Sequence, residues 1–194
     1  MFEYKGDRNY LHGTDFYKFS AEYGEKNFSS SAYVEQLSFR QIARCQSEIT
    51  HSKPSSGNIV STGKFMLPNG EVQPFWWVET EAQVVGRYEF DEDGLVSTAI
   101  IDEETKTISM NHVSDNYSCI EEVVALNKKL NNTVKKPENG KWLFGQLHLS
   151  KKLPVVYKNI EIKLDVMLHN KFSVSDIWLD GVHFGQIRFI VGRT

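Results

Sequence analysis

Two similar octets, 100 positions apart, constrain what this chain can fold into more than any other feature of its sequence. "YLHGTDFY" (residues 10–17) and "MNHVSDNY" (residues 110–117) both place His, then Thr or Ser two positions on, then Asp, then Tyr two further on. Thr14 and Ser114, each followed by Asp, stand where a helix N-cap and a first-turn acid belong, since their oxygens accept from free N–H groups at the positive helix end. The repetition predicts two helices that begin alike, and it leaves open whether the octets are also functional sites.

Apolar periodicity after each octet predicts the helices themselves. Four residues of the first stripe fall at i, i+3, i+4 and i+7: Phe16, Phe19, Ser20 and Tyr23. Because Gly24 is expected to end the helix at positive φ, the first helix is predicted over residues 15–23. The apolar residues that follow the second octet recur at helical spacing as far as Leu130. A polar segment and Pro137 come next, so a longer helix is predicted over residues 117–131.

The segments after each helix have the pattern of antiparallel strands. Residues 159–168 ("NIEIKLDVML") alternate apolar and polar side chains, as a strand with one buried face does. Asp180-Gly181 separates two further apolar segments and is a strong hairpin signal, because both residues tolerate positive φ. Residues 84–111 are expected to supply meander strands between the two halves.

The two halves also match outside the octets. "QLSF" (residues 36–39) corresponds to "QLHL" (residues 146–149), and residues 59–78 and 172–191 both have the pattern strand, glycine-containing turn, strand. These matches support two halves of the order strand, helix, then several antiparallel strands.

One helix that follows a strand and precedes a curved antiparallel sheet resembles the hotdog fold, and two in tandem resemble a double hotdog. The resemblance rests on element order and internal repetition over nearly the whole chain. It implies an α+β fold of two units, each with one central helix wrapped by an antiparallel β-sheet, over residues 1–101 and 102–194. The competing architecture is a β-barrel or sandwich with appended helices, such as a lipocalin-like barrel. That architecture gives no reason for two His-x-Ser/Thr-Asp octets that each open a helix.

The resemblance also implies a function. Hotdog proteins commonly bind acyl thioesters of coenzyme A or acyl carrier protein, as thioesterases, dehydratases or hydratases, with the thioester carbonyl near the start of the central helix. Backbone N–H groups at a helix start can hold a developing oxyanion, and nearby His, Asp or Glu side chains can move protons. In a dehydratase-like scheme His12 takes a proton alpha to the carbonyl, whereas in a thioesterase-like scheme a carboxylate activates water or attacks directly.

The resemblance identifies the first octet as the candidate site. The expected catalytic residues are His12 and Asp15, and the expected substrate contacts are Gly13, Thr14, Tyr17, Gln36 and Trp76. Gly13 favours the first octet, because a residue without Cβ lets a ligand approach the backbone, whereas its counterpart Val113 crowds that approach. Whether His112 and Asp115 of the second octet are functional is left open.

The alternative hypothesis is a noncatalytic β-rich binding module. In it the octets only cap helices, Asp15 is a first-turn acid and Tyr17 a packing residue, and a cavity holds an apolar ligand or a protein partner. Whether the protein is an enzyme therefore stays open.

Composition limits the other function classes. A net charge of −3, from 22 basic and 25 acidic residues mixed along the chain, indicates no basic stripe, so nucleic acid is not an expected partner. No apolar run approaches the roughly 20 residues that span a bilayer, and "MFEYKGDRNY" lacks a signal layout, so we expect a cytoplasmic protein without membrane contact. Cys45 and Cys119 show no C-x-x-C spacing, so no metal or other cofactor is expected. A tandem chain supplies its own pair of units, and further association into a homo-oligomer is compatible with it.

Overall fold

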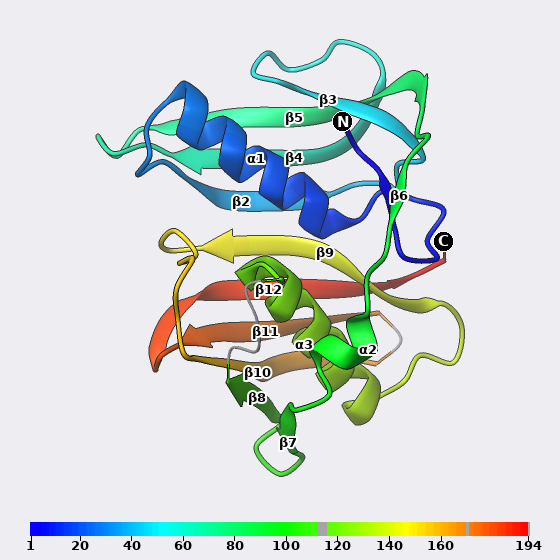
Figure 1. The fold of residues 1–194 in the computed structure, drawn as a ribbon, viewed down its shortest axis with the longest axis vertical. Coiled ribbons are helices and arrows are strands. Elements are labelled where there is room, and N and C mark those ends of the chain that lie inside the picture. The colour runs from blue at the N-terminus through cyan, green and yellow to red at the C-terminus, as the bar shows by residue number, and fades with distance from the viewer. Residues whose placement is uncertain (112–115, 170, 194) are drawn as a thin grey trace. The chain divides into compact units, whose positions relative to one another are not determined.

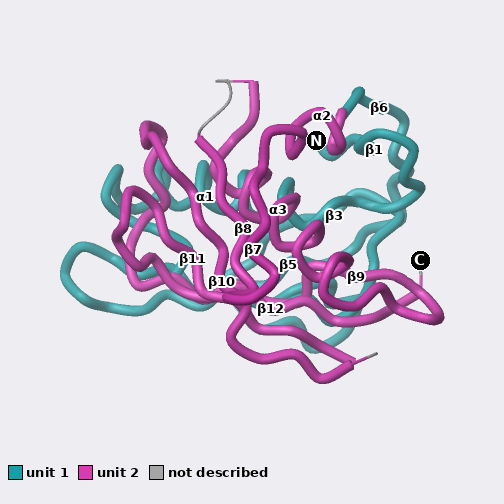
Figure 2. Tube along the Cα trace, turned by 90° about the horizontal axis from the view of Figure 1, so that it is seen from below, with its two compact units in different colours: residues 1–90 teal, residues 91–194 magenta. Residues whose placement is uncertain are grey.

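The computed structural model describes residues 1–111, 116–169 and 171–193, and the chain forms two compact units, Met1–Phe90 and Asp91–Thr194 (Figure 2). Each unit has one long helix and an antiparallel sheet, so the predicted α+β class is confirmed. The division into halves 1–101 and 102–194 stays a prediction.

Unit 1 is built around a four-stranded sheet that one helix covers on one face. Its elements are β1 (Tyr4–Lys5), α1 (Gly13–Asn27), β2 (Tyr33–Phe39), β3 (Cys45–Thr50), β4 (Asn58–Met66), β5 (Val72–Gln83) and β6 (Arg87–Tyr88). The sheet has the order β3-β5-β4-β2 with antiparallel pairs, while β1 and β6 form a separate parallel pair (Figure 1). Phe65 and Phe75 stack on the sheet face that α1 covers, with ring centroids 4.4 Å apart, and Trp77 on the same face donates to Ser20 of α1 at 2.9 Å.

Helix α1 is longer than the sequence predicts. It continues to Asn27, and Gly24 lies inside it with an ordinary negative φ instead of ending it. A Cβ atom at Gly24 would lie 3.0 Å from the ring of Phe65 on β4, so this glycine lets the helix approach the sheet closely. The predicted end of the helix was wrong because a glycine that ends a helix and one that permits close packing look alike in sequence.

Unit 2 has a six-stranded sheet with a longer helix on it. Its elements are α2 (Glu92–Leu95), β7 (Ile100–Asp102), β8 (Thr107–Asn111), α3 (Cys119–Val134), β9 (Lys141–Leu149), β10 (Asn159–Leu168), β11 (Phe172–Leu179) and β12 (Val182–Gly192). The sheet has the order β9-β12-β11-β10-β8-β7, and α3 packs on it through an apolar stripe that includes Val123, Leu126 and Leu130 (Figure 1).

Several predicted elements of unit 2 are confirmed. Strand β10 has the predicted bounds, and Asp180-Gly181 joins β11 to β12 with φ angles of 49° and 74°. The expectation of meander strands over residues 84–111 was correct only in part, since the segment contains β6, β7 and β8 but also helix α2. Helix α3 begins at Cys119 after the N-cap Ser118, so the predicted cap at Ser114 was wrong; Ser114 itself lies outside the described residues.

The two sheets differ in strand order. In unit 2, β10, β11 and β12 are neighbours in chain order, whereas in unit 1 the edge strand β3 pairs with β5 and not with β4. The hairpins that match in sequence therefore occupy different places, because the first strand of the β4-β5 hairpin lies beside β2 while the second strand of the β11-β12 hairpin lies beside β9.

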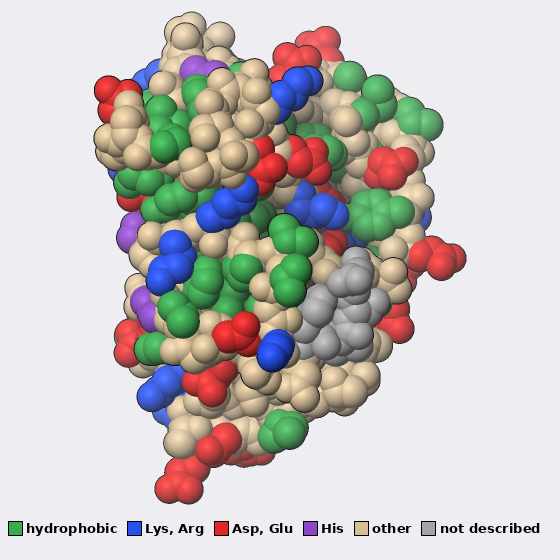
Figure 3. All heavy atoms as spheres, turned by 60° about the vertical axis from the view of Figure 1, so that its left-hand side comes forward, with side chains coloured by type: hydrophobic (Ala, Val, Ile, Leu, Met, Phe, Trp, Pro, Cys, Tyr) green, Lys and Arg blue, Asp and Glu red, His purple; other side chains and the backbone are tan. Residues whose placement is uncertain are grey.

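Surface charge is mixed on the face drawn in Figure 3, where Lys and Arg side chains lie among Asp and Glu side chains. Among the described residues, no helix combines the length and the apolar character needed to cross a membrane.

Candidate functional site

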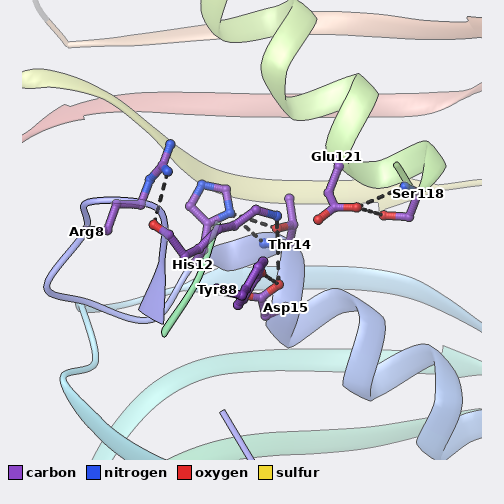
Figure 4. A network of polar contacts seen from close by, with 8 residues as sticks. Arg8, His12, Thr14, Asp15, Tyr88, Ser118 and Glu121 are labelled. Atoms are coloured by element: carbon purple, nitrogen blue, oxygen red, sulfur yellow. Dashed lines mark hydrogen bonds and ion pairs between the residues drawn. The ribbon is translucent and has the colours of Figure 1, made fainter. Parts of the chain in front are cut away.

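A short parallel pair of strands brings two distant side chains to the start of α1. Strand β1 pairs with β6 in the register Tyr4 with Arg87 and Lys5 with Tyr88. Backbone bonds from Tyr4 N to Gly86 O (2.9 Å) and from Gly6 N to Tyr88 O (2.8 Å) hold this pairing. The pairing places Lys5 beside the first turn of α1. It also places Tyr88 there, next to Asp15 (Figure 4).

His12 is the N-cap of α1. Its backbone is extended (φ −84°, ψ 141°), and its Nδ1 atom accepts from the backbone N–H of Thr14. The sequence predicts Thr14 as the cap, and this was wrong, because the imidazole nitrogen takes the place of the usual cap oxygen and Thr14 lies inside the first turn. The cap keeps the ring of His12, which is half-buried, at the positive end of the helix.

Thr14 connects His12 to a buried lysine. Thr14 is 1% exposed and Lys5 is 0% exposed. The Thr14 Oγ1 atom lies 3.0 Å from Lys5 Nζ and 2.7 Å from His12 Nδ1. Figure 4 shows Thr14 next to the His12 ring. A fully buried lysine is rare in proteins and requires partners for its charge.

Asp15 supplies one of those partners. Its Oδ1 atom lies 3.9 Å from Lys5 Nζ and accepts a 2.7 Å hydrogen bond from the Tyr88 hydroxyl. Lys5 Nζ also lies 4.0 Å from the centroid of the Phe90 ring, a cation–π contact. Asp15 is 7% exposed, so its carboxylate is directed into this network and away from solvent.

The start of α1 keeps one backbone donor that is not used inside the helix. Asp15 N and Phe16 N both bond to His12 O, at 3.0 and 3.4 Å. In the described part of the chain no acceptor is recorded for the N–H of Gly13, the first residue of the helix. A backbone donor at a helix start, next to an imidazole, can stabilise a carbonyl oxygen that gains negative charge.

The structure brings four of the seven predicted site residues together: His12, Gly13, Thr14 and Asp15. Tyr17 lies farther along the same helix and is buried (7% exposed).

Gln36 and Trp76 lie elsewhere. They are on the sheet face opposite α1, since Gln36 is paired with Lys64 and Trp76 with Thr62, while their neighbours Leu37 and Trp77 face the helix. A β-bulge between Val34 and Gln36 inverts the alternation of side chains along β2, so the expected substrate contact Gln36 does not share a sheet face with the start of α1.

Lys5 and Tyr88 are the members of this network that the sequence did not reveal. Each lies in a strand of two residues, which is too short to show a periodic pattern. A charged residue so close to the N-terminus resembles a solvated side chain, and only the parallel pairing of β1 with β6 places it inside unit 1.

The second octet is described only in part, because His112, Val113, Ser114 and Asp115 lie outside the described residues. At the start of α3, the backbone N–H and hydroxyl of Ser118 both donate to Glu121 Oε2, at 2.9 and 2.6 Å (Figure 4).

A second buried polar cluster follows that cap. The Tyr157 hydroxyl donates to Glu122 Oε2 at 2.6 Å, and Glu122 is 0% exposed. Burial raises the pKa of the Cys119 thiol to about 12 and also raises the pKa of Tyr157. Both Cys45 and Cys119 are free thiols. Within residues 1–111, 116–169 and 171–193, no three His, Cys, Asp or Glu side chains are grouped as metal ligands.

Neither a family model nor a curated protein matches the sequence. Among solved structures, a putative thioesterase II from Thermobifida fusca YX has a TM-score of 0.50 at 8% identity, over 96% of this chain and 88% of that chain. The dehydratase domain of the polyketide PpsC from Mycobacterium tuberculosis has a TM-score of 0.49 at 9% identity, over 95% of this chain and 85% of that chain. The dehydratase domain of PpsC in complex with C12:1-CoA has a TM-score of 0.48 at 8% identity, over 94% of this chain and 85% of that chain. The likeness to the Thermobifida structure shows that this chain has the hotdog fold, as the order of its elements predicts.

Proposed function

We propose that this protein binds an acyl thioester of coenzyme A or of an acyl carrier protein at the start of α1, and that it is a thioesterase-like or dehydratase-like enzyme. The hotdog fold and the name of the Thermobifida neighbour, a putative thioesterase, support this class of substrate. The observation that carries the proposal is that the His12 ring and the Gly13 N–H lie at one helix start, where the ring contacts Thr14 and Thr14 contacts the buried Lys5.

The roles of the residues follow from their exposure and contacts. The thioester carbonyl would accept from the Gly13 N–H, where the helix dipole stabilises negative charge. His12 is half-buried and would contact the substrate directly. Asp15 is buried against Lys5 and Tyr88, and these contacts favour a positioning role for it over a direct catalytic one.

We extend the proposal to the origin of the fold, as a double hotdog made by duplication. Both units place one long helix on an antiparallel sheet, and in both the strand after the helix carries a matching "QL" pair, on β2 and β9. The different strand orders of the two sheets confine the proposed repeat to the helix and the strand that follows it.

The proposal is tested with a panel of acyl-coenzyme A and acyl-carrier thioesters, by native mass spectrometry, thermal shift and assay of free thiol. We expect binding or turnover in the wild type and its loss in both His12→Ala and Gly13→Val, because the first removes the ring and the second crowds the backbone donor. His148→Ala is the matched control, since His148 lies exposed on β9.

Binding that neither substitution changes would contradict a site at the start of α1. Absence of binding to every thioester would contradict the substrate class and would leave the noncatalytic binding module as the better hypothesis.

A further inference from the structure

We propose that Lys5 and Thr14 hold His12 in the tautomer whose ring hydrogen is on Nε2, so that His12 donates a hydrogen bond to the substrate instead of removing a proton from it. The inference rests on the proposed function for its substrate. Its geometry rests on three side chains of unit 1.

The Thr14 hydroxyl has a defined direction. In the described part of the chain its oxygen has two polar side-chain neighbours, Lys5 Nζ at 3.0 Å and His12 Nδ1 at 2.7 Å. An ammonium group has donors only, so the Thr14 oxygen accepts from Lys5. The single hydroxyl hydrogen is then directed to His12 Nδ1, at which the backbone N–H of Thr14 also points from 3.4 Å.

The surroundings of Lys5 keep it a donor. Its side chain is 0% exposed, and Nζ lies 3.9 Å from Asp15 Oδ1 and 4.0 Å from the centroid of the Phe90 ring. Tyr88 donates to the same carboxylate oxygen at 2.7 Å, which favours the anionic form of Asp15. The anion and the aromatic face around Lys5 Nζ offset the desolvation that burial imposes on an ammonium group.

A neutral imidazole has one N–H group and one acceptor nitrogen. Because Nδ1 of His12 accepts, the hydrogen lies on Nε2. His12 then presents a donor next to the backbone donor of Gly13, and the two together can hold an oxyanion better than one.

The consequence is a choice between the two reaction schemes. A His12 ring whose Nε2 already carries hydrogen cannot take the proton alpha to the thioester carbonyl at that atom. The chain of contacts from Lys5 through Thr14 therefore favours the thioesterase-like scheme. In it His12 and Gly13 polarise the carbonyl, the oxygen of a water molecule bonds to the carbonyl carbon, the C–S bond breaks, and the two hydrogens of the water end on the carboxylic acid and the released thiol. In this scheme Lys5 and Thr14 are positioning residues.

The test is a long-range ¹⁵N–¹H correlation spectrum of protein labelled with ¹⁵N-histidine, which reports the tautomer of each ring without any substrate. The His12→Gln variant assigns the His12 signals by their disappearance. We expect neutral His12 to show only the Nε2–H pattern in the wild type and in Thr14→Ser, which keeps the hydroxyl. In Thr14→Val we expect this single pattern to be lost and replaced by a mixture of tautomers.

An Nδ1–H pattern in the wild type would overturn the inference, and so would an unchanged pattern in Thr14→Val. If Thr14→Val does not fold, the wild type and Thr14→Ser spectra still decide the tautomer. The Nε2–H pattern together with a failure to bind any thioester would contradict the proposed function alone. Thioester binding together with the Nδ1–H pattern would contradict only the assigned role of His12.

Discussion

The hydroxyl of Tyr88 donates a 2.7 Å hydrogen bond to the carboxylate of Asp15, a residue 73 positions earlier in the chain. This bond ties the last strand of unit 1 to the first turn of α1. It is one of the contacts that the Oδ1 atom of this buried carboxylate makes.

Replacement of this donor is expected to destabilise unit 1. Tyr88→Phe removes the hydroxyl and leaves the Asp15 carboxylate with one hydrogen bond fewer, so we expect a loss of about 1–3 kcal/mol in the free energy of unfolding, measured by urea denaturation. Tyr4→Phe is the matched control, because the Tyr4 hydroxyl donates to Arg44 O at 2.8 Å at an exposed position. An equal loss in both variants would contradict the special role of the buried bond.

The ion pair of Lys5 and Asp15 is expected to show strong coupling. Lys5→Met leaves the Asp15 carboxylate without its buried cation, and such a change typically costs about 3–5 kcal/mol. Adding Asp15→Asn removes the uncompensated charge, so the double variant should lose less than the sum of the single variants in a double-mutant cycle.

The pair Lys128 and Glu92 provides the control for this cycle. Lys128 Nζ and Glu92 Oε2 lie 2.8 Å apart, closer than the charged atoms of Lys5 and Asp15, but the two side chains are 33% and 19% exposed. Lys128→Met should therefore cost less than about 1 kcal/mol. Additive losses for Lys5 and Asp15 would contradict a coupled buried pair.

The sequence predicts the two long helices and several strands, and it places the first octet at the beginning of a helix, because each of these features depends on residues close together in the chain. Four of the predicted site residues are consecutive, so they lie together at one helix start in any tertiary structure: His12, Gly13, Thr14 and Asp15. The positions of Gln36 and Trp76 depend instead on which strand face meets the helix. For Gln36, one bulge in β2 determines on which face the side chain lies. For Trp76, the sequence does not determine the face, because Trp77 is adjacent and either tryptophan could be the one that meets the helix.

The contacts of Lys5 and Tyr88 with the start of α1 depend on pairing between segments that are distant in the sequence. Lys5 and Tyr88 come together through a parallel ladder of two residue pairs, which has no sequence pattern of its own. The strand order of unit 1 is equally nonlocal, since the pairing of β3 with β5 leaves β4 beside β2. Local periodicity specifies that these segments are strands but not which of them are neighbours.

Two buried asparagines on α3 are expected to respond differently to the same substitution. Asn127 and Asn131 are both 0% exposed, but Asn131 Nδ2 donates to Ser173 Oγ at 2.8 Å, whereas neither amide atom of Asn127 has a hydrogen-bond partner in the described protein. Asn127→Leu should leave the free energy of unfolding unchanged or raise it, because an unsatisfied buried amide is replaced by an apolar group.

Asn131→Leu serves as the comparison and should lower the free energy of unfolding by about 1–3 kcal/mol, since it leaves the buried Ser173 hydroxyl without its donor. Urea denaturation of both variants checks the difference. A larger loss for Asn127→Leu than for Asn131→Leu would show that the Asn127 amide is satisfied in solution.

Burial raises the pKa of the Cys119 thiol from its ordinary value of 9.0 to about 12, and this gives the stability of the protein an alkaline dependence. The folded protein retains the thiol proton where the unfolded chain has lost it. The stabilisation is therefore complete below about pH 9 and is lost as the pH rises toward about 12, at up to about 1.4 kcal/mol per pH unit.

In a Cys45→Ser background, where Cys119 is the remaining thiol, we expect the free energy of unfolding to fall more steeply above pH 9 than it does after Cys119→Ala. Equal slopes in urea denaturation of the two proteins between about pH 7 and about pH 10 would contradict a protonated, buried thiol.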